Sequence, residues 1–363
     1  WAMSYKFKSP QAITVLNNIK YQIGRTGAIT PVAQLESVHL AGSLISRASL
    51  HNHDFIKKLD LKIGDYVIIE KGGDVIPKVV SVDVRKRNFK CEDIVFITNC
   101  PSCNSLLQKI AGEVNYYCLN HLCLPQRIAQ VQHFTSRDAM NIQTLGDKTI
   151  ALLFKQKIIQ DIADLYILDV NKLIDLPGFG EKSKSRKKAQ NIIESINVSK
   201  KQSFERVLFG LGIRYVGKTV SKKLAQYFQS MSILMNSSVE NLLEVSEVGE
   251  KIANSIVNYF QDSTNKLMIG RLMQSGLQFS IELRDKYSSK LDNLVFVVSG
   301  VFSVRREEIK EIIEDHGGKN SSSISKKTNF LLGGEKIGVK KREKAQILGI
   351  PIITESDFRE MLN

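Results

Sequence analysis

The chain has 363 residues and carries 51 lysines and arginines against 37 aspartates and glutamates, a formal net charge of +14. That length allows two to four domains, and a hydrophobic share of 43% allows each of them a core. The positive residues are spread along the whole chain, which favours a nucleic acid as the partner. With no long apolar run and no recognisable signal peptide, we expect neither a membrane span nor secretion.

The chain begins at Trp1 with WAMSYKF and has no initiator methionine, so we expect it to be a fragment of a larger protein. Residues 11–84 alternate apolar and polar side chains in short runs separated by glycine and proline. This pattern predicts strands, with one helix around His51–Lys58. The expected product is a small closed β-barrel, which in oligonucleotide-binding proteins exposes one face to a nucleic-acid backbone. Arg25 and Lys71 lie at two of the turns and are expected to point outward, although spacing alone leaves open that both are ordinary solvated turn residues.

Four of the five cysteines fall between residues 100 and 123, as CPSC followed by a polar hairpin and CLNHLC. Two short knuckles of this spacing bring four thiolates onto one ion, and a tetrahedral set of soft sulfur ligands favours Zn²⁺. Four protein ligands leave no open position, so we expect a structural site. The alternatives are a pair of disulfides, unrelated buried thiols, or His121 in place of one cysteine. The predicted ligands are Cys100, Cys103, Cys118 and Cys123. The cysteine-poor remainder favours the reducing cytoplasm.

Residues 128–279 change to helical spacing with a recurring signature, in which a glycine precedes an amphipathic run. Intervals of roughly 30 to 40 residues suit a repeated unit of helix, tight turn and second helix. Each glycine lets a phosphate approach the free N–H groups that open the second helix. We expect two or three of the four loops to contact a DNA backbone and one to serve mainly in packing. The alternative is that some of the glycines are plain helix caps. The candidate glycines are Gly146, Gly178, Gly180, Gly217 and Gly249.

One segment of this region, Gly212–Thr219 (GIRYVGKT), satisfies the G-x-x-x-x-G-K-[ST] pattern of a nucleotide-binding loop. That motif requires a hydrophobic strand directly before it. The preceding SFERVLFGL has the apolar spacing of a helix instead. We therefore predict that the segment belongs to the hairpin repeat and does not bind ATP.

Polar residues 280–290 mark a linker, and residues 291–363 then alternate strands and helices. This order predicts a small parallel α/β sheet, with one strand around residues 321–325. Gly317 and Gly318 are expected to end its first helix.

Several segments closely resemble, in this order, the bacterial NAD⁺-dependent DNA ligases: WAMSYKF, QIGRTGAITPVAQLE, GDYVIIEKGGDVIPKV and the four-cysteine knuckles. The hairpin repeat also matches that family, and the last sheet resembles a BRCT domain, so that the resemblance covers essentially the whole chain. It implies the tail of an adenylation domain (1–9), an OB-fold barrel (10–90), a four-cysteine zinc finger (91–127), an all-α helix-hairpin-helix domain (128–279), a linker (280–290) and an α/β BRCT domain (291–363).

The resemblance also assigns residues. Lys6 matches the lysine that contacts the nucleotide phosphate, and Arg25, with Thr26 beside it, matches the arginine that engages DNA at the nick. Lys71 falls where the family more often has an arginine, whose fork binds phosphate bidentately as a lysine cannot. Phe358 replaces the usual tryptophan of the last BRCT helix, and for this single copy we expect weak DNA or protein contact rather than phosphopeptide binding. Apolar contacts near the DNA are implied for Val75 and Ile76.

By this resemblance, the complete enzyme transfers AMP from NAD⁺ to a lysine and then to the 5′-phosphate of a nick, where the 3′-hydroxyl displaces it. Mg²⁺ is implied, because metal ions neutralise phosphoryl charge in such transfers. The adenylated lysine belongs to a K-x-D-G motif that this sequence lacks, so we expect no self-adenylation by this chain alone. The expected partner of this cytoplasmic bacterial monomer is nicked duplex DNA, and no membrane. A non-enzymatic DNA repair or replication scaffold is the alternative.

Overall fold

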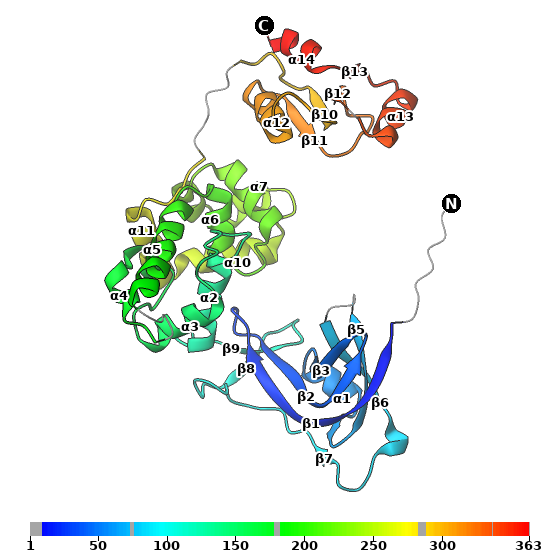
Figure 1. Cartoon of the computed structure of the whole chain (residues 1–363), viewed down its shortest axis with the longest axis vertical. Coiled ribbons are helices and arrows are strands. Elements are labelled where there is room, and N and C mark those ends of the chain that lie inside the picture. The colour runs from blue at the N-terminus through cyan, green and yellow to red at the C-terminus, as the bar shows by residue number, and fades with distance from the viewer. Residues whose placement is uncertain (1–8, 73–75, 178–181, 282–287, 336, 363) are drawn as a thin grey trace. The chain divides into compact units, whose positions relative to one another are not determined.

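The computed structural model describes residues 9–72, 76–177, 182–281, 288–335 and 337–362 (Figure 1). These residues form two compact units, with the boundary between Ile281 and Glu282. The first unit contains a β-barrel, a four-cysteine region and a set of helices, and the second is a small α/β unit. Within the described ranges, no helix combines the length and the apolarity that crossing a bilayer requires.

The predicted small closed barrel is confirmed, and five strands close it in the order β1-β2-β3-β6-β5. They are β1 Gln11–Ile23, β2 Ile29–Leu40, β3 Ser43–Ser49, β5 Tyr66–Gly72 and β6 Ile76–Val82. The predicted helix is α1, His53–Lys58, and the short strands β4 (Lys62–Ile63) and β7 (Glu92–Asp93) pair beside the barrel. The strands have one face toward the barrel core, as the alternation of side chains along a strand requires. In the first half of β2 every second residue is buried: Ile29, Pro31, Ala33 and Leu35.

An ion pair beside the barrel joins the start of β5 to the segment that leaves β6. Asp65 is fully buried, and the guanidinium of Arg87 donates to both of its carboxylate oxygens at 2.8 Å. Arg87 also donates to the Asp60 carboxylate at 2.6 Å. The bidentate fork satisfies a charge that would otherwise be costly to bury.

Two strands, β8 (Leu107–Lys109) and β9 (Tyr116–Cys118), form an antiparallel hairpin within the cysteine region. The helical region follows and has one large apolar core. In α7 the buried residues Ser221, Leu224, Ala225 and Phe228 show the spacing of one helix face. The described helices are α2 Leu124–Thr135, α3 Asp147–Lys155, α4 Val170–Ile174, α5 Lys182–Ser199, α6 Phe204–Gly210, α7 Lys218–Phe228, α8 Met231–Met235, α9 Val239–Leu243, α10 Glu250–Gln261 and α11 Ser263–Gln274.

The second unit is built on a parallel sheet of order β11-β10-β12-β13, which confirms the predicted α/β class. Its strands are β10 Val295–Ser299, β11 Lys319–Ser321, β12 Phe330–Gly333 and β13 Ile352–Ile353, and its helices are α12 Arg306–Asp315, α13 Val339–Ile347 and α14 Glu355–Leu362. The strand expected at 321–325 instead ends at Ser321, where its pairing with β10 ends. Phe358, which stands where a tryptophan was expected, is 1% exposed and packs edge-on against Phe296. The phenylalanine ring is therefore part of the core of this unit.

Replacing Arg87 with Ala should lower the free energy of unfolding of the barrel by about 3–5 kcal/mol, because the buried Asp65 carboxylate loses its cationic partner and keeps only the N–H of Lys62. Urea unfolding followed by amide signals of the barrel strands measures this loss. The double variant Arg87→Ala/Asp65→Ala should recover part of it, since removing both partners leaves no unpaired charge. A loss below about 1 kcal/mol in the single variant would contradict the assigned role of the pair.

Candidate functional site

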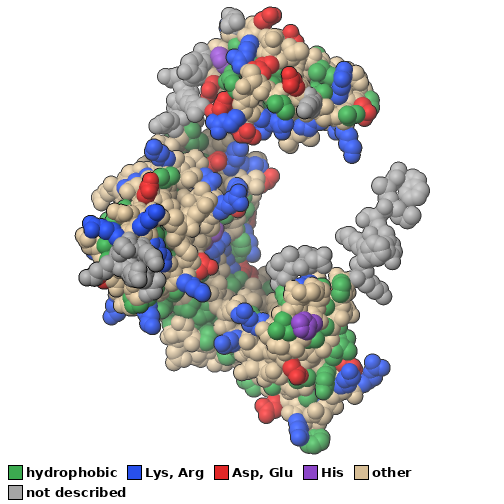
Figure 2. Space-filling view, viewed as in Figure 1, with side chains coloured by type: hydrophobic (Ala, Val, Ile, Leu, Met, Phe, Trp, Pro, Cys, Tyr) green, Lys and Arg blue, Asp and Glu red, His purple; other side chains and the backbone are tan. Residues whose placement is uncertain are grey.

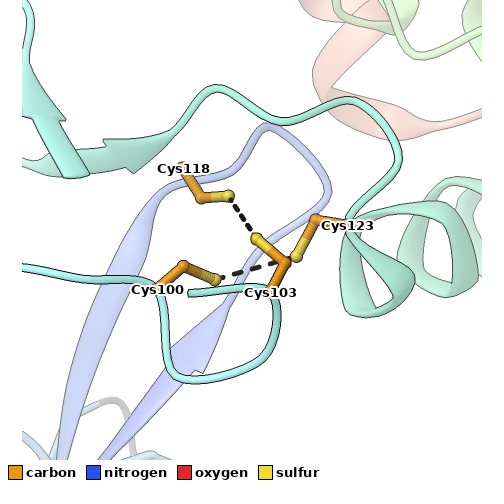
Figure 3. Close-up of side chains that lie close together, drawn as sticks. All are labelled: Cys100, Cys103, Cys118 and Cys123. Carbon is orange, nitrogen blue, oxygen red and sulfur yellow. Dashed lines mark hydrogen bonds between the residues drawn. The ribbon is translucent and has the colours of Figure 1, made fainter. Parts of the chain in front are cut away.

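The four predicted cysteine ligands converge from three places in the chain (Figure 3). Cys100 and Cys103 lie in the loop between β7 and β8, Cys118 ends β9, and Cys123 is the N-cap residue of α2. Their Sγ atoms all lie within 4.8 Å of one another. All but Cys103 are buried almost completely.

The sulfur positions fit a tetrahedral zinc ion. The Sγ atoms of Cys100 and Cys123 are 3.8 Å apart, and those of Cys103 and Cys118 are 3.5 Å apart. A tetrahedron with Zn–S bonds of about 2.3 Å has edges of about 3.8 Å. A disulfide would bring two sulfurs to about 2.05 Å, so the disulfide alternative is wrong. His121 is exposed and is not part of the cluster.

The environment of the thiols explains why a cation is needed to ionise them together. Burial raises the pKa of Cys118 to about 11 and also raises that of Cys123. A hydrogen bond with Ser105 lowers the pKa of Cys103 to about 6. Thiolates are the form that binds metal, so metal binding here must release protons. Because four sulfurs close the coordination sphere, the ion would hold the structure together and perform no chemistry.

The cysteine region is attached to the barrel through the turn between β1 and β2. Cys118 donates its N–H to the carbonyl of Gly27 at 2.9 Å, and Gly27 has φ +81°. A Cβ on Gly27 would come within 2.2 Å of the Cys118 carbonyl oxygen, so only glycine allows this approach. Gln126 of α2 donates to the same carbonyl at 2.9 Å. One ligand residue therefore contacts both the barrel and the helical region.

The barrel also contacts the loop that precedes α7, residues 212–217 (the 212–217 loop). Arg25 is half-buried and donates to the Gly212 carbonyl at 2.7 Å. Burial lowers the pKa of Arg25. The ring of His133, from α2, makes a hydrogen bond of 2.9 Å to the Phe209 carbonyl beside it. The predicted DNA-contacting arginine thus lies where the barrel meets the helical region.

A second contact to the 212–217 loop comes from Glu113, between β8 and β9. Its carboxylate accepts hydrogen bonds from Arg214 and Tyr117, both at 2.5 Å, and from the hydroxyl of Tyr215, and it lies 3.5 Å from the ammonium of Lys251. Burial would raise the pKa of Glu113, but the bonds from Tyr117 and Tyr215 and the charges of Arg214 and Lys251 hold it at about 2. Glutamate in an unfolded chain has a pKa of about 4.3, so the stability from this network is complete above that pH and is lost as the pH falls toward 2.

The described helices of the helical region differ in how their N-termini are capped. At α2 and α6 the N-cap residues, Cys123 and Ser203, make no side-chain cap hydrogen bond. At α4, α8, α9 and α11 a side chain accepts hydrogen bonds from the first N–H groups: Asp169, Ser230, Ser238 and Asp262. At α3, α7 and α10 the N-cap residue is a predicted glycine, Gly146, Gly217 or Gly249, and no side-chain cap is present. A Cβ built on any of these three glycines meets nothing within 4 Å, so no other group occupies the place of an N-cap side chain.

Not every predicted site residue is where the sequence indicated. Lys71 was expected to point outward from a turn, but β5 extends to Gly72, and alternation places Val67, Ile69 and Lys71 on the inner side. Lys71 is 7% exposed, and its ammonium donates to the Ala41 carbonyl and the Ser43 hydroxyl. Thr26 is half-buried beside Arg25. Lys6, Val75, Gly178 and Gly180, together with the side chain of Ile76, lie outside the described residues.

The nucleotide-loop alternative for GIRYVGKT fails for the predicted reason. The preceding segment is the helix α6, with Phe204, Val207 and Leu208 buried, and the loop itself contacts Arg25 and Glu113. Sequence reasoning missed Glu113, Arg214 and Tyr215 as a network, because nothing in their local pattern distinguishes them from solvated loop residues.

On the face drawn in Figure 2, lysine and arginine side chains are spread over the surface, as the sequence indicated.

Comparison with known families finds five matching segments in the chain. Domain-family models match in the following order: the NAD-dependent DNA ligase OB-fold domain at residues 13–90, the NAD-dependent DNA ligase C4 zinc finger domain at 99–123, a SAM-like helix-hairpin-helix tandem at 136–197, a helix-hairpin-helix motif at 206–269 and a BRCT domain at 286–362.

Several relatives match this chain over its whole length. Proteins named DNA ligase from Phocaeicola vulgatus, Flavobacterium johnsoniae and Christiangramia forsetii are 48%, 48% and 49% identical over 366, 367 and 366 residues. Each comparison covers 100% of this chain and 54% of the relative. The chain therefore spans about half the length of the curated relatives it matches.

Replacing Cys100 with Ser should reduce the bound zinc below roughly one ion per chain. It should also change the orientation of the barrel relative to the helical region, while both parts stay folded. Metal analysis measures the first effect. Residual dipolar couplings of barrel and helix amides measure the second. Cys91→Ser, which alters a cysteine outside the cluster, is the control and should change neither. Unchanged relative orientation in a zinc-free Cys100→Ser chain would show that the metal is dispensable as a joint.

Proposed function

The chain belongs to the NAD-dependent DNA ligase family and corresponds to its carboxy-terminal part; from this premise we propose that it is the DNA-binding portion of an enzyme that seals nicks in duplex DNA. The complete enzyme would pass AMP from NAD⁺ to a lysine and then to the 5′-phosphate of the nick, with Mg²⁺ neutralising phosphoryl charge. It would act as a monomer in the bacterial cytoplasm. This chain lacks the K-x-D-G lysine, and its share of the task would be to hold the duplex.

The observation that carries this proposal is that α3, α7 and α10 each begin at a glycine with no side-chain cap and with open space at its Cβ position. The first N–H groups of a helix need an acceptor, and they carry the positive end of the helix dipole. Gly146, Gly217 and Gly249 have φ of −77°, −88° and −97°, which any residue can adopt. Neither backbone strain nor packing in the free protein therefore requires glycine at these positions. What glycine provides is room for an external anion to reach the N–H groups, and a DNA phosphate fits that description.

These contacts would position DNA without reading its sequence, as a ligase requires. The formal charge of +14 adds general attraction to the phosphate backbone. Arg25 lies beside the 212–217 loop and would engage the duplex close to α7. Lys6 would contact the nucleotide phosphate, and Val75 and Ile76 would pack near the DNA. Because Lys71 is buried, we assign it support of the turn between β2 and β3 rather than a first contact with DNA.

Replacing Gly217 or Gly249 with Asp tests the proposal, because aspartate caps a helix and repels phosphate. Each variant should fold with unchanged or higher thermal stability, yet bind nicked duplex DNA more weakly. The slope of log K against log salt concentration should become less steep by about 0.9 for each phosphate that the variant no longer binds. Titration of labelled nicked duplex at several salt concentrations measures both quantities.

Gly270→Asp is the matched control for this test. It makes the same charge change within α11, where an added Cβ also meets nothing within 4 Å, and it should leave the salt slope unchanged. If the two hairpin variants keep the affinity and slope of the unaltered chain, α7 and α10 do not bind DNA phosphate.

A further inference from the structure

Glu113 belongs to the zinc finger, yet its carboxylate contacts the segments that open two helices of the hairpin region. Arg214 and Tyr215 come from the 212–217 loop before α7, and Lys251 comes from the first turn of α10. Both helices begin at uncapped glycines. Glu113, which lies outside the hairpin region, therefore contacts residues beside the N-termini of both α7 and α10.

The 212–217 loop has a backbone shape that needs support. Gly212 has φ +71° and Tyr215 has φ +65°, and a bulky aromatic residue seldom adopts the left-handed region. The ring of Tyr215 lies under two cations, with the Arg214 guanidinium 5.0 Å and the Lys251 ammonium 4.6 Å from its centroid. Its hydroxyl donates to Glu113. These contacts hold Tyr215 in its strained backbone conformation.

The loop before α10 repeats the arrangement with a different partner. Glu247 stands two residues before Gly249, as Tyr215 stands two residues before Gly217, and it has φ +69°. Its carboxylate lies 2.9 Å from the ammonium of Lys223 on α7. Each loop thus has a left-handed residue at the same place, held by a contact from another element. Only in the 212–217 loop does that contact come from the zinc finger.

We propose that Glu113 is a positioning residue for DNA: through Tyr215 and Arg214 it holds the 212–217 loop in the shape that leaves the N-terminus of α7 open to a phosphate. The inference rests on the proposed function, in which α7 contacts the DNA backbone. It gives the zinc finger an effect on DNA binding that requires no contact between Glu113 and DNA.

Simple electrostatics makes the opposite prediction. Removing a negative charge beside Arg214 and Lys251 strengthens the attraction of a basic surface for phosphate. Loss of positioning removes a phosphate contact and weakens binding. The sign of the change therefore separates the two effects.

The experiment measures binding of the 363-residue chain to nicked duplex DNA across a range of salt concentrations. Glu113→Ala should weaken binding and make the salt slope less steep by about 0.9, the value for one phosphate contact. Glu113→Gln keeps an oxygen acceptor for Tyr215 and should give an intermediate effect. Tyr215→Phe removes only the hydroxyl and should act in the same direction. Zinc content should stay at that of the unaltered chain in all three.

Two further variants make the test specific. Glu92→Ala removes an exposed glutamate from β7 and reports the pure effect of charge, which should be unchanged or slightly tighter binding. Gly217→Asp blocks the N-terminus of α7 directly. In that background Glu113→Ala should cause no further change in slope, because the phosphate is already excluded from the helix that Glu113 serves.

The outcomes separate the inference from the function on which it rests. If Gly217→Asp weakens binding while Glu113→Ala leaves affinity and slope unchanged or tightens binding, the positioning role is wrong. Additive effects in the double variant would also overturn it. If Gly217→Asp itself has no effect, the proposed phosphate contact fails and the inference falls with it. If Glu113→Ala loses zinc, Tyr215→Phe gives the answer, since unchanged binding in that variant contradicts the proposal.

Discussion

Four thiols within 4.8 Å of one another are the constraint on which the first unit depends. Thiolates this close repel one another unless a cation lies between them, and burial makes each one harder to ionise alone. The ligands come from the loop after β7, the end of β9 and the start of α2, so an ion that gathers the sulfurs also fixes these three segments. Cys118 also attaches these segments to the barrel. Its N–H donates to the Gly27 carbonyl, and its own carbonyl lies so close to Gly27 that no side chain would fit there.

In the helical region, some helices have a side-chain cap and others begin at a glycine. Ser230, Ser238 and Asp262 satisfy the first N–H groups of α8, α9 and α11 from within the chain. Glycines open α3, α7 and α10 and leave the corresponding groups without a side-chain partner. Cys123 and Ser203 also open α2 and α6 without a side-chain cap, so the missing cap alone does not set the glycine N-termini apart. What sets them apart is that an added Cβ at Gly146, Gly217 or Gly249 would meet no other atom within 4 Å.

The GIRYVGKT segment shows why a motif has meaning only in its context. The same residues satisfy a nucleotide-loop pattern and a hairpin repeat, and the element before them decides between the two. Phe204, Val207 and Leu208 form a buried helix face, which removes the strand that a nucleotide loop needs. The loop instead accepts a bond from Arg25 and donates bonds to Glu113, so the barrel, the zinc finger and the hairpins meet there.

Local pattern was sufficient for the four-cysteine cluster, the closed barrel, the helical region and the α/β class of the second unit, because spacing along the chain dictates which side chains share a face or a knuckle. It was not sufficient for Lys71, whose burial depends on how far β5 continues before its turn. Nor did it reveal the bonds from Arg25 to Gly212 and from Arg214 to Glu113, which join residues 187 and 101 positions apart. Only the folded chain decides these contacts, since a charged loop residue carries no local sign of the partner that tertiary packing will bring to it.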